Sequence, residues 1–502
     1  MISYSHFSHE WTRSVFPYVV PRSNDFRVYV NGKEIPAYTC RISAYPFNRH
    51  WPGHQRAVNQ SEMVSYVNLV ADEAVTVEVE PLSKPVDGHV MIKPYSKGVQ
   101  AERVGNRIRF TLSQNGGYVL QIDDYHGMLY LFCNKPVECK NPESVTHYFG
   151  KGVHFAGKIT LRSHESIYVD RDALVYGCIC AENAEDIHIY GNGIFDDSTE
   201  ERICEPCYEP YANGNIKLYD CKNVRIKGVG FVNSAIWCVN LFHCFDVSID
   251  AINVFGQWRY NTDGIDIVNS QRVTVKNSFV HSFDDTITVK GIERYSYESC
   301  RDMLFENCVL WCDWGKTCEI GLETDAPEYA NIAFRNCDIL RGGNTVCDIQ
   351  NGDCAEVHDI VFDDIRYELE KFYTPYRLQR SEDAVYDVKD EIEIPYLLSV
   401  KNKRFRASYN VPDAKPNVLA IGDPRFASVH DITVSNIRVF CNEAVEAEFG
   451  THAVRILVNN TIPTTRYGNI TVKNVTLNGR SVSKEEMEIT VMENAEGVLQ
   501  VD

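Results

Sequence analysis

Three aspartates in two short motifs have the type and spacing that favour catalysis. Asp263 lies in an Asn-Thr-Asp-Gly segment, and Asp284 and Asp285 form a pair that begins 21 residues after it. Carboxylates held close together cannot all ionise easily, so one should keep its proton and serve as a general acid. An inverting glycosidase needs such an acid and a base about 6.5–9.5 Å apart, with a water between them. A single Asp is more often structural, but the two motifs together predict hydrolysis of a glycosidic bond.

A repeat in the sequence would bring these aspartates together. From about residue 155, a polar residue, an aliphatic residue, any residue and another aliphatic or Phe recur; the copies begin at Asp186, Asn223, Asp246, Arg272, Asp302, Asn331, Asp359, Asp431 and Asn469. From Asn223 to Asp359 the steps are 23, 26, 30, 29 and 28 residues. Strands this short bury a face only by stacking, so the repeat predicts a parallel β-solenoid. A spacing of 21 residues is close to one coil and would place the three carboxyl groups on one face.

Residues 1–150 lack the repeat and show alternating strands separated by Asn-Gly and Pro-rich turns. This pattern is typical of an antiparallel β-sandwich. We therefore expect a sandwich domain over 1–150 and the solenoid over 151–502. One step of the solenoid is long, and its residues 366–428 are charged, aromatic and rich in proline. We interpret them as an insertion, either a lid over a cleft or a decoration without function.

Composition excludes some functions. The formal net charge of -19 disfavours a nucleic-acid binder, although a local cationic pocket could still hold an acidic glycan. The N-terminal segment lacks the pattern of an export signal and there is no long apolar run, which predicts a cytoplasmic chain without a membrane span. The 18 cysteines are then expected to be reduced thiols, and Cys204 and Cys207 form an isolated pair that does not predict a metal site. No cofactor or metal is predicted, and a homo-oligomer remains an open alternative.

The two aspartate motifs resemble those of the polygalacturonase family, glycoside hydrolase family 28. The segment Asn233–Trp237 is similar to the coil that leads into its site, and Asp285–Gly291 is similar to the segment that follows its Asp-Asp pair, one residue shorter. The resemblance covers roughly 148–362 and implies a right-handed parallel β-helix. A β-sandwich ahead of the helix also resembles the related dextranase family 49, which shares the three-aspartate site.

The resemblance also implies roles. Asp284 would be the general acid, and Asp263 and Asp285 would hold and deprotonate the attacking water, with inversion at the anomeric carbon. Asn261 and Lys290 would orient these groups or a sugar hydroxyl.

Two departures from the family bear on the substrate. The Gly-His-Gly of the family should fall near Gly315, where Lys316 replaces the His. Its Arg-Ile-Lys should fall at Asp348–Gln350, which has lost both cations that grip a galacturonate carboxylate in the pectinases. We therefore predict that the sugar on the reducing side is not a uronate. Lys316 and Gln350 remain candidate substrate-binding residues.

Other side chains near the motifs are weaker candidates. Aromatic faces stack on sugar rings, so candidate platforms are Trp258, Tyr260, Trp311 and Trp314, with packing between coils favoured for each. Glu323 is a candidate for a hydrogen bond to substrate, by similarity to a family 28 segment. We expect His281 to be structural. Asp266 should point away from Asp263, because their spacing along a strand is odd.

Two other functions stay open. A β-helix polysaccharide lyase or epimerase needs a Lys or Arg base, usually with calcium, and the missing cations disfavour it. A carbohydrate-binding solenoid without catalysis has no need of three clustered acids, whose repulsion destabilises the fold. The preferred hypothesis is an inverting glycosidase that acts on an oligosaccharide or polysaccharide. Exo-action on a short oligosaccharide is expected, because a cytoplasmic enzyme meets imported oligosaccharides and the insertion could close one end of the cleft.

Overall fold

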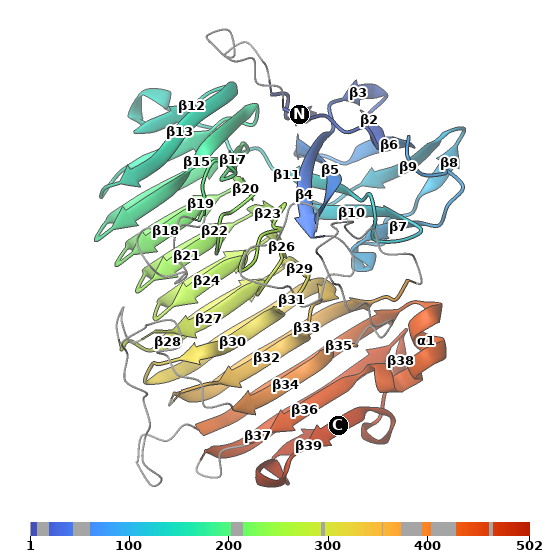
Figure 1. Cartoon of the computed structure of the whole chain (residues 1–502), viewed down its shortest axis with the longest axis vertical. Coiled ribbons are helices and arrows are strands. Elements are labelled where there is room, and N and C mark those ends of the chain that lie inside the picture. The colour runs from blue at the N-terminus through green and yellow to red at the C-terminus, as the bar shows by residue number, and fades with distance from the viewer. Residues whose placement is uncertain are drawn as a thin grey trace, which may run out of the picture.

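The chain is built almost entirely of β-strands, as the computed structural model shows (Figure 1). The structure describes residues 2–7, 20–43, 61–201, 214–292, 297–353, 355–372, 394–402, 428–460 and 465–502. Its strands form a 6-stranded, a 5-stranded and a 29-stranded sheet. Within these ranges there is one α-helix, α1 (Glu443–Phe449), and no helix long and apolar enough to cross a membrane.

The two smaller sheets form the N-terminal β-sandwich. One sheet contains β1 (Ile2–Tyr4), β4 (Tyr38–Ser43), β5 (Ser61–Ala71), β7 (Val90–Lys93), β10 (Gly116–Ile122) and β11 (Leu129–Asn134). The other contains β2 (Phe26–Val30), β3 (Lys33–Ile35), β6 (Val75–Pro81), β8 (Glu102–Val104) and β9 (Arg107–Leu112). Apolar side chains of both sheets share one buried core. The pairings are antiparallel, except that β11 runs parallel to β5.

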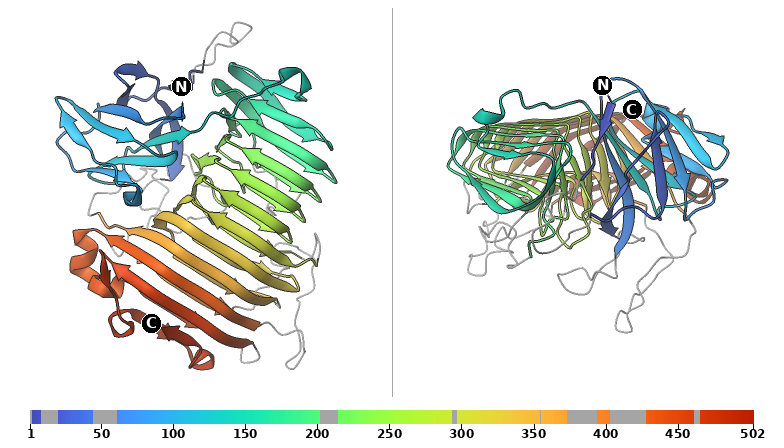
Figure 2. Two further views of the ribbon diagram at one scale, coloured as in Figure 1. Left: turned by 180° about the vertical axis from the view of Figure 1, so that it is seen from behind. Right: turned by 90° about the horizontal axis from the view of Figure 1, so that it is seen from above.

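The 29-stranded sheet winds into a right-handed parallel β-helix, which confirms the predicted fold class (Figures 1 and 2). Its strands stack in three columns. The first column carries the sequence repeat and consists of β12 (His147–Phe149), β14 (Ser166–Val169), β16 (Glu185–Gly191), β19 (Lys222–Lys227), β22 (Phe245–Asp250), β25 (Gln271–Lys276), β28 (Cys300–Glu306), β31 (Glu328–Gly342), β33 (Glu356–Leu369), β35 (Ser428–Cys441), β37 (Arg466–Leu477) and β40 (Leu499–Val501).

The second column is short and the third is long. The second consists of β17 (Ile194–Asp196), β20 (Gly230–Val232), β23 (Asn253–Phe255), β26 (Phe279–Ser282) and β29 (Val309–Cys312). The third consists of β18 (Ile216–Tyr219), β21 (Val239–Phe242), β24 (Ile265–Val268), β27 (Ile287–Gly291), β30 (Lys316–Thr324), β32 (Thr345–Asn351), β34 (Tyr396–Asn402), β36 (Arg455–Asn459) and β39 (Glu488–Val491). Two long strands, β13 (Gly152–Leu161) and β15 (Ala173–Glu182), begin both columns, and β38 (Arg480–Ser481) pairs with β37.

The polar residue that begins each copy of the repeat turns the chain. All nine of these residues, from Asp186 to Asn469, have φ between 47° and 60°. Asn and Asp tolerate this left-handed conformation better than most residues. Their side chains also bond from coil to coil: the Asn331 amide donates to Asp302 at 2.7 Å. The repeat is therefore a series of stacked turns, each followed by aliphatic side chains in the solenoid core.

Cysteines fill part of that core. All fifteen cysteines among the described residues are free thiols, and several stack in register, such as Cys318 and Cys347. Cys204 and Cys207 lie outside the described residues.

An aromatic cluster joins the sandwich to the second column. The ring of Phe132 lies 4.7 Å from that of Phe255 and 5.3 Å from that of Phe279. A buried ion pair adds to this contact, because Lys93 of the sandwich binds Glu370 and reaches Glu368 at 3.2 Å. The sandwich is thus packed against the column that leads into the acidic turns.

The segment 366–428 is not one continuous insertion. Its first residues continue β33 to Leu369, and Tyr396–Asn402 forms β34, which pairs in parallel with β32 and β36. The long step in the repeat therefore contains a regular strand of the third column. Residues 373–393 and 403–427, on which the lid hypothesis depends, lie outside the described residues.

Candidate active site

The turns between the second and third columns hold the three aspartates. Asp263 precedes β24, and Asp284 and Asp285 precede β27, one coil further on. Ile265 pairs with Ile287 in the sheet, and the Gly264 amide donates to the carbonyl of Asp285 at 2.8 Å. A Cβ on Gly264 would lie 2.4 Å from the Thr286 carbonyl oxygen, so the stacking of these two turns requires glycine there. The structure thus brings the predicted acids together.

One lysine ties the first part of the site. Lys290 Nζ on β27 donates to Asp263 Oδ2 and to Asp266 Oδ1, each at 2.8 Å, and lies 3.7 Å from Asp285 Oδ2. The ammonium also lies 3.9 Å from the centre of the Trp237 ring, a cation–π contact. Although burial acts to lower it, the carboxylates of Asp263 and Asp266 hold the pKa of Lys290 well above its usual value. Asp263 and Asp266 thus share one ammonium, and we call these two acids, with the lysine between them, the Lys290 pair.

The prediction that Asp266 points away from Asp263 is wrong. It assumed that both residues belong to one strand with alternating side chains, but β24 begins at Ile265 and Asp263 lies in the turn before it. The turn rotates the Asp263 side chain, so both carboxyl groups reach the same ammonium. Burial then raises the pKa of Asp266 well above its usual value.

A second lysine ties the other part. Lys316 Nζ lies 3.5 Å from Asp285 Oδ1 and 3.1 Å from Glu319 Oε1, and the Lys316 backbone amide donates to Asp285 Oδ1 at 3.0 Å. Asp285 and Glu319 thus share one ammonium, and we call these two acids, with the lysine between them, the Lys316 pair. Gly315 lies against it: a Cβ there would be 2.5 Å from Oδ1 of Asp285 and 2.5 Å from Oδ1 of Asp284. These two oxygens are therefore no further apart than twice that distance.

Asp284 is the acid best suited to keep a proton. Burial raises its pKa well above the usual value, and repulsion from Asp285 and Asp263 adds to the effect. The side-chain amide of Asn261 donates to Asp284 Oδ2 at 3.3 Å, so this predicted residue does contact the acid. A carboxyl group that stays neutral near neutral pH can serve as a general acid.

The other two aspartates titrate differently. Burial raises the pKa of Asp263 to about 6, opposed by Lys290. Burial also acts to raise the pKa of Asp285, but the ammonium groups of Lys316 and Lys290 outweigh it and lower that pKa to about 2. The site therefore combines a proton donor, a carboxylate of intermediate basicity and a carboxylate that stays ionised.

Predicted aromatic residues fall into two groups. Tyr260 and Trp314 lie near each other, with ring centres 5.7 Å apart, and Trp314 stacks on Phe283 at 5.7 Å; both are half-buried, next to the acids in the chain. Trp258 instead contacts Arg41 of the sandwich at 5.6 Å and Arg259 at 5.4 Å. Tyr260 and Trp314 are therefore the better placed to meet a sugar ring.

Trp311 does not fit its platform role, because it is fully buried. Its indole N–H donates to Asp313 Oδ1 at 2.8 Å, and the same oxygen contacts His281 Nε2 at 2.9 Å. The other ring nitrogen of His281 contacts the Tyr130 hydroxyl at 2.6 Å. Both side chains thus belong to a buried network against the sandwich, as expected for His281.

The remaining predicted residues lie on β30 and β32 of the third column, and we call the surface formed by these strands and β34 the floor of the site. Glu323 is close enough to Lys290 to help raise its pKa. Gln350 is buried on β32 and lies opposite Lys401 on β34. Lys401 Nζ reaches Asp348 Oδ1 at 3.4 Å. Lys401 therefore places one cation beside Asp348 and Gln350, the positions at which family 28 has Arg and Lys. This cation comes from the next coil and is paired with an acid.

Several residues of this site were missed from the sequence. Trp237 and Lys401 contact the charged groups directly, and Glu319 and Asp348 are fully buried acids on neighbouring strands of the same floor. A signal was present: in the third column a polar residue between two apolar ones recurs in register, at Asp266, Thr288, Glu319, Asp348 and Ser399. Aligning the coils by this column would have found the acids.

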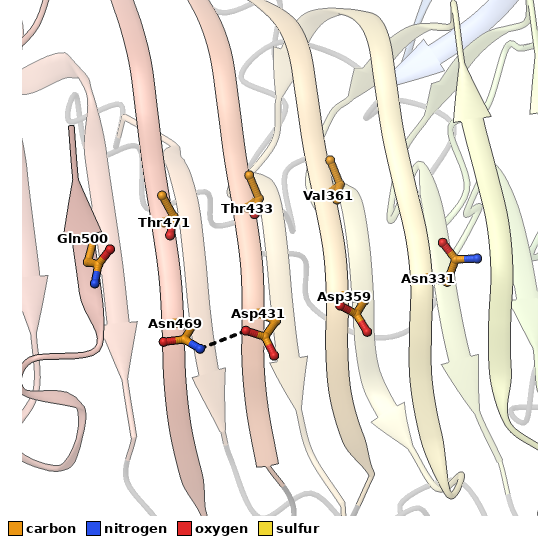
Figure 3. Close-up of a pocket in the computed structure, with 8 residues that line it drawn as sticks. All are labelled: Asn331, Asp359, Val361, Asp431, Thr433, Asn469, Thr471 and Gln500. Carbon is orange, nitrogen blue, oxygen red and sulfur yellow. Dashed lines mark hydrogen bonds between the residues drawn. The ribbon is translucent and has the colours of Figure 1, made fainter.

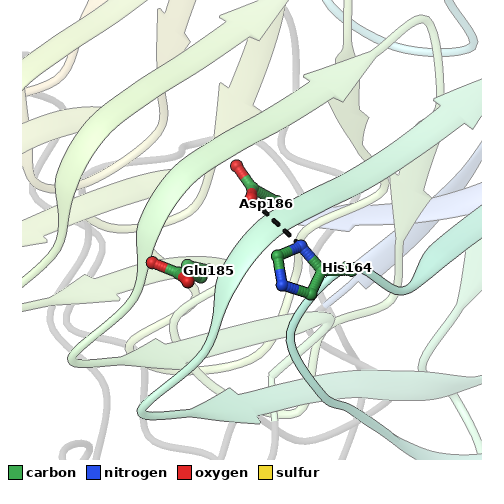
Figure 4. Close-up of side chains that lie close together, drawn as sticks. All are labelled: His164, Glu185 and Asp186. Carbon is green, nitrogen blue, oxygen red and sulfur yellow. Dashed lines mark ion pairs between the residues drawn. The ribbon is translucent and has the colours of Figure 1, made fainter.

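Two further groups of polar side chains lie elsewhere on the solenoid. A groove on the first column is lined by polar residues of the repeat such as Asp359, Asp431 and Asn469, which lie on the neighbouring strands β33, β35 and β37 (Figure 3). On another turn, His164 and Asp186 form an exposed ion pair at 3.0 Å beside Glu185 (Figure 4). This is the one His-and-acid group in the described part of the chain whose ligand atoms could share a metal ion. Both belong to the turn ladders of the solenoid.

Comparison with known proteins bears on the β-helix and on the segment that carries the acidic site. The sequence model of glycosyl hydrolases family 28 matches residues 141–373, which confirms the resemblance over that part of the chain. An exopolygalacturonase from Zea mays is 31% identical over 90 residues, which cover 15% of this chain and 22% of the maize protein. The chain thus matches less than a quarter of that relative's length.

Solved structures of two other proteins align with this chain. Dex49A from Penicillium minioluteum aligns with a TM-score of 0.59 and 13% identity, over 97% of this chain and 96% of that one. An exopolygalacturonase from Thermotoga maritima aligns with a TM-score of 0.48 and 15% identity, over 71% of this chain and 83% of that one. The likeness to Dex49A extends over nearly all of both chains and shows a common fold.

Proposed function

We propose that this chain is an inverting glycosidase that hydrolyses a neutral oligosaccharide. The observation that carries the proposal is that Asp263, Asp284 and Asp285 lie on adjacent stacked turns, with Oδ1 of Asp284 and Oδ1 of Asp285 both next to Gly315. Burial raises the pKa of Asp284, and the nearby lysines lower that of Asp285, which supports different roles for these acids. The family 28 match supports the coarser statement that the protein is a glycosidase.

The proposed reaction uses each acid once. Asp284 gives its proton to the glycosidic oxygen as the bond from that oxygen to the anomeric carbon breaks. A water attacks the anomeric carbon from the opposite face and loses a proton to Asp263. Asp263 Oδ1 is buried and has no hydrogen-bond partner among the described residues, while Oδ2 is held by Lys290, so one oxygen keeps a vacant acceptor position. Asp285 stays ionised and stabilises the positive charge that develops on the sugar.

A neutral substrate follows from the charges of the site. Lys290, Lys316 and Lys401 each already contact a carboxylate. The same floor also holds Glu323 and Asp348. A uronate carboxylate would therefore meet repulsion from these acids, and none of the three lysines is a spare cation to offset it. Exo-action remains a prediction, supported only by the name of the maize relative, an exopolygalacturonase.

The test is a panel of defined neutral oligosaccharides and oligogalacturonates, incubated with the wild-type chain and with Asp284→Asn. We expect the wild type to hydrolyse a neutral substrate and to release single units from one chain end. Proton NMR spectra should show the inverted anomer first. Asp284→Asn should show no hydrolysis. An unsaturated product would instead indicate a lyase. If the wild type binds an oligosaccharide without turning it over, and Asp284→Asn at most weakens that binding, the protein is a carbohydrate-binding solenoid.

A further inference from the structure

The Lys316 pair contains a buried acid to which the proposed reaction gives no role. Glu319 is fully buried on β30, and it occupies the same register as Asp266 two coils earlier, with Thr288 between them. Each of these two acids shares one ammonium with an aspartate of the preceding turns. The arrangement around Lys290 is thus repeated around Lys316.

Ionised Glu319 would be poorly satisfied in this position. Neither of its carboxylate oxygens accepts a hydrogen bond from the described residues, and its one cationic contact is the ammonium that it shares with Asp285. Asp348 lies opposite it on β32 and adds a further negative group. Burying a carboxylate without donors is costly, and a second carboxylate nearby makes it costlier. A proton on Glu319 removes both costs, because the neutral group becomes a hydrogen-bond donor.

We propose that Glu319 is a positioning residue that stays neutral and donates its carboxyl proton in a hydrogen bond to Asp285. Its role is to keep the negative charge on Asp285, next to the reacting sugar. The role in catalysis rests on the proposed function, but the protonation of Glu319 does not.

The electrostatics of the surrounding groups agree with this geometry. The charged groups that face Glu319 are Asp285 from the turn before β27, Lys316 from its own strand, and Asp348 from β32. Burial and the charge of Asp285 raise the pKa of Glu319 well above its usual value, and a hydrogen bond between the two side chains adds to the rise. The same hydrogen bond helps to lower the pKa of Asp285. The proton therefore belongs on Glu319.

A neutral donor has an advantage over a further cation here. A third ammonium beside Asp285 would also act on Asp284 and promote loss of the proton that the general acid must keep. The carboxyl group of Glu319 instead stabilises one carboxylate through a directed hydrogen bond and adds no net charge.

The first experiment measures protonation without any substrate. Infrared difference spectra of the full-length chain at neutral pH are recorded for wild type against Glu319→Gln. We expect a protonated-carboxyl band that is present in the wild type and missing from the variant. Thr317→Val, a similarly buried change on the same strand, should leave that band in place. A band that is unchanged in Glu319→Gln, or one that Thr317→Val removes equally, would overturn the proposal.

The second experiment separates a neutral donor from an ionised partner of Lys316. Glutamine keeps an N–H donor but no charge, so Glu319→Gln should retain kcat within a few-fold. Glu319→Ala should lose about 10- to 100-fold in kcat with little change in KM, the cost of one hydrogen bond to a charged group. Equal losses in the two variants, with both still folded by circular dichroism, would mean that Glu319 acts through negative charge. If the wild type hydrolyses nothing, the proposed function fails, and the infrared result still decides the state of Glu319.

Discussion

The Lys290 pair and the Lys316 pair use the same parts but leave their aspartates in different states. Each consists of a turn aspartate, an acid from the third column and a lysine between them. Burial raises the pKa of Asp263 to about 6, because the one ammonium that it shares with Asp266 offsets the desolvation only in part. Asp285 lies near two ammonium groups and accepts the Lys316 backbone amide, and its pKa falls to about 2. Two similar acids thus differ by their donors, as is common at sites that need both a base and a fixed charge.

The largest effects should come from replacing the turn aspartates. Asp263→Asn removes the proposed base, and Asp285→Asn removes the fixed charge, so each should lower kcat/KM by about 10²- to 10⁴-fold. Asp266→Asn should cost about tenfold, because Asp266 acts through Lys290. Steady-state kinetics on the best substrate would measure all three. If Asp266→Asn lowers kcat/KM as much as Asp263→Asn does, Asp266 does not act only through Lys290.

The two lysines should differ in their importance for stability. Lys290→Met leaves two buried acids without their cation and should cost about 3–5 kcal/mol of unfolding free energy. The Lys316 side chain is 21% exposed, so solvent can replace it in part and Lys316→Met should cost about 1–3 kcal/mol. Urea unfolding at neutral pH would measure both losses. Because the abandoned acids can take up protons, the loss in Lys290→Met should shrink at lower pH, and a pH-independent loss would contradict this account.

Stability should depend on pH with opposite signs for the two aspartates. The folded-state pKa of Asp263 is raised, so its contribution is complete below about pH 4 and is lost as the pH rises through about 6. The folded-state pKa of Asp285 is lowered, so its contribution is present above about pH 4 and is lost as the pH falls through about 2. Each amounts to about 2–3 kcal/mol.

Urea titrations across this pH range would test both contributions. Asp263→Asn should flatten the fall in stability between about pH 4 and 6. Asp285→Asn should flatten the loss at acid pH and reduce the fall at higher pH only in part, because the charge of Asp285 is a secondary cause of the raised pKa of Asp263. The same slope in both variants would show that the two pairs are not electrostatically distinct.

A smaller effect should come from Gly315, which lies against both Asp284 and Asp285. Gly315→Ala places a methyl group 2.5 Å from an oxygen of Asp284 and of Asp285, which should cost about 1–3 kcal/mol and displace both carboxylates. Gly468→Ala is the control, because its added Cβ meets nothing closer than 3.8 Å. Thermal unfolding and kcat would report the two effects. A fully active Gly315→Ala would mean that these carboxylates can shift without loss of function.

The fold and the stacking of the acidic turns could be predicted from the sequence, because every coil of a solenoid repeats the same short pattern of residue types. Polar residues at the start of each repeat adopt left-handed turns, and the aliphatic residues after them fill the core. That period sufficed to predict the β-helix and to stack Asp263 on the Asp284 and Asp285 turn. The assigned roles of these residues stay predictions.

Only the tertiary structure decided how the charges are shared. Asp266 joins Asp263 because a turn, and not a strand, carries Asp263, and Glu319 meets Asp285 because a lysine of the same strand reaches both. Lys401 reaches Asp348 from a strand that the sequence pattern had hidden within the segment 366–428. Which carboxyl group keeps its proton depends on burial and on distances of a few ångström between side chains, and a linear pattern of residue types specifies neither.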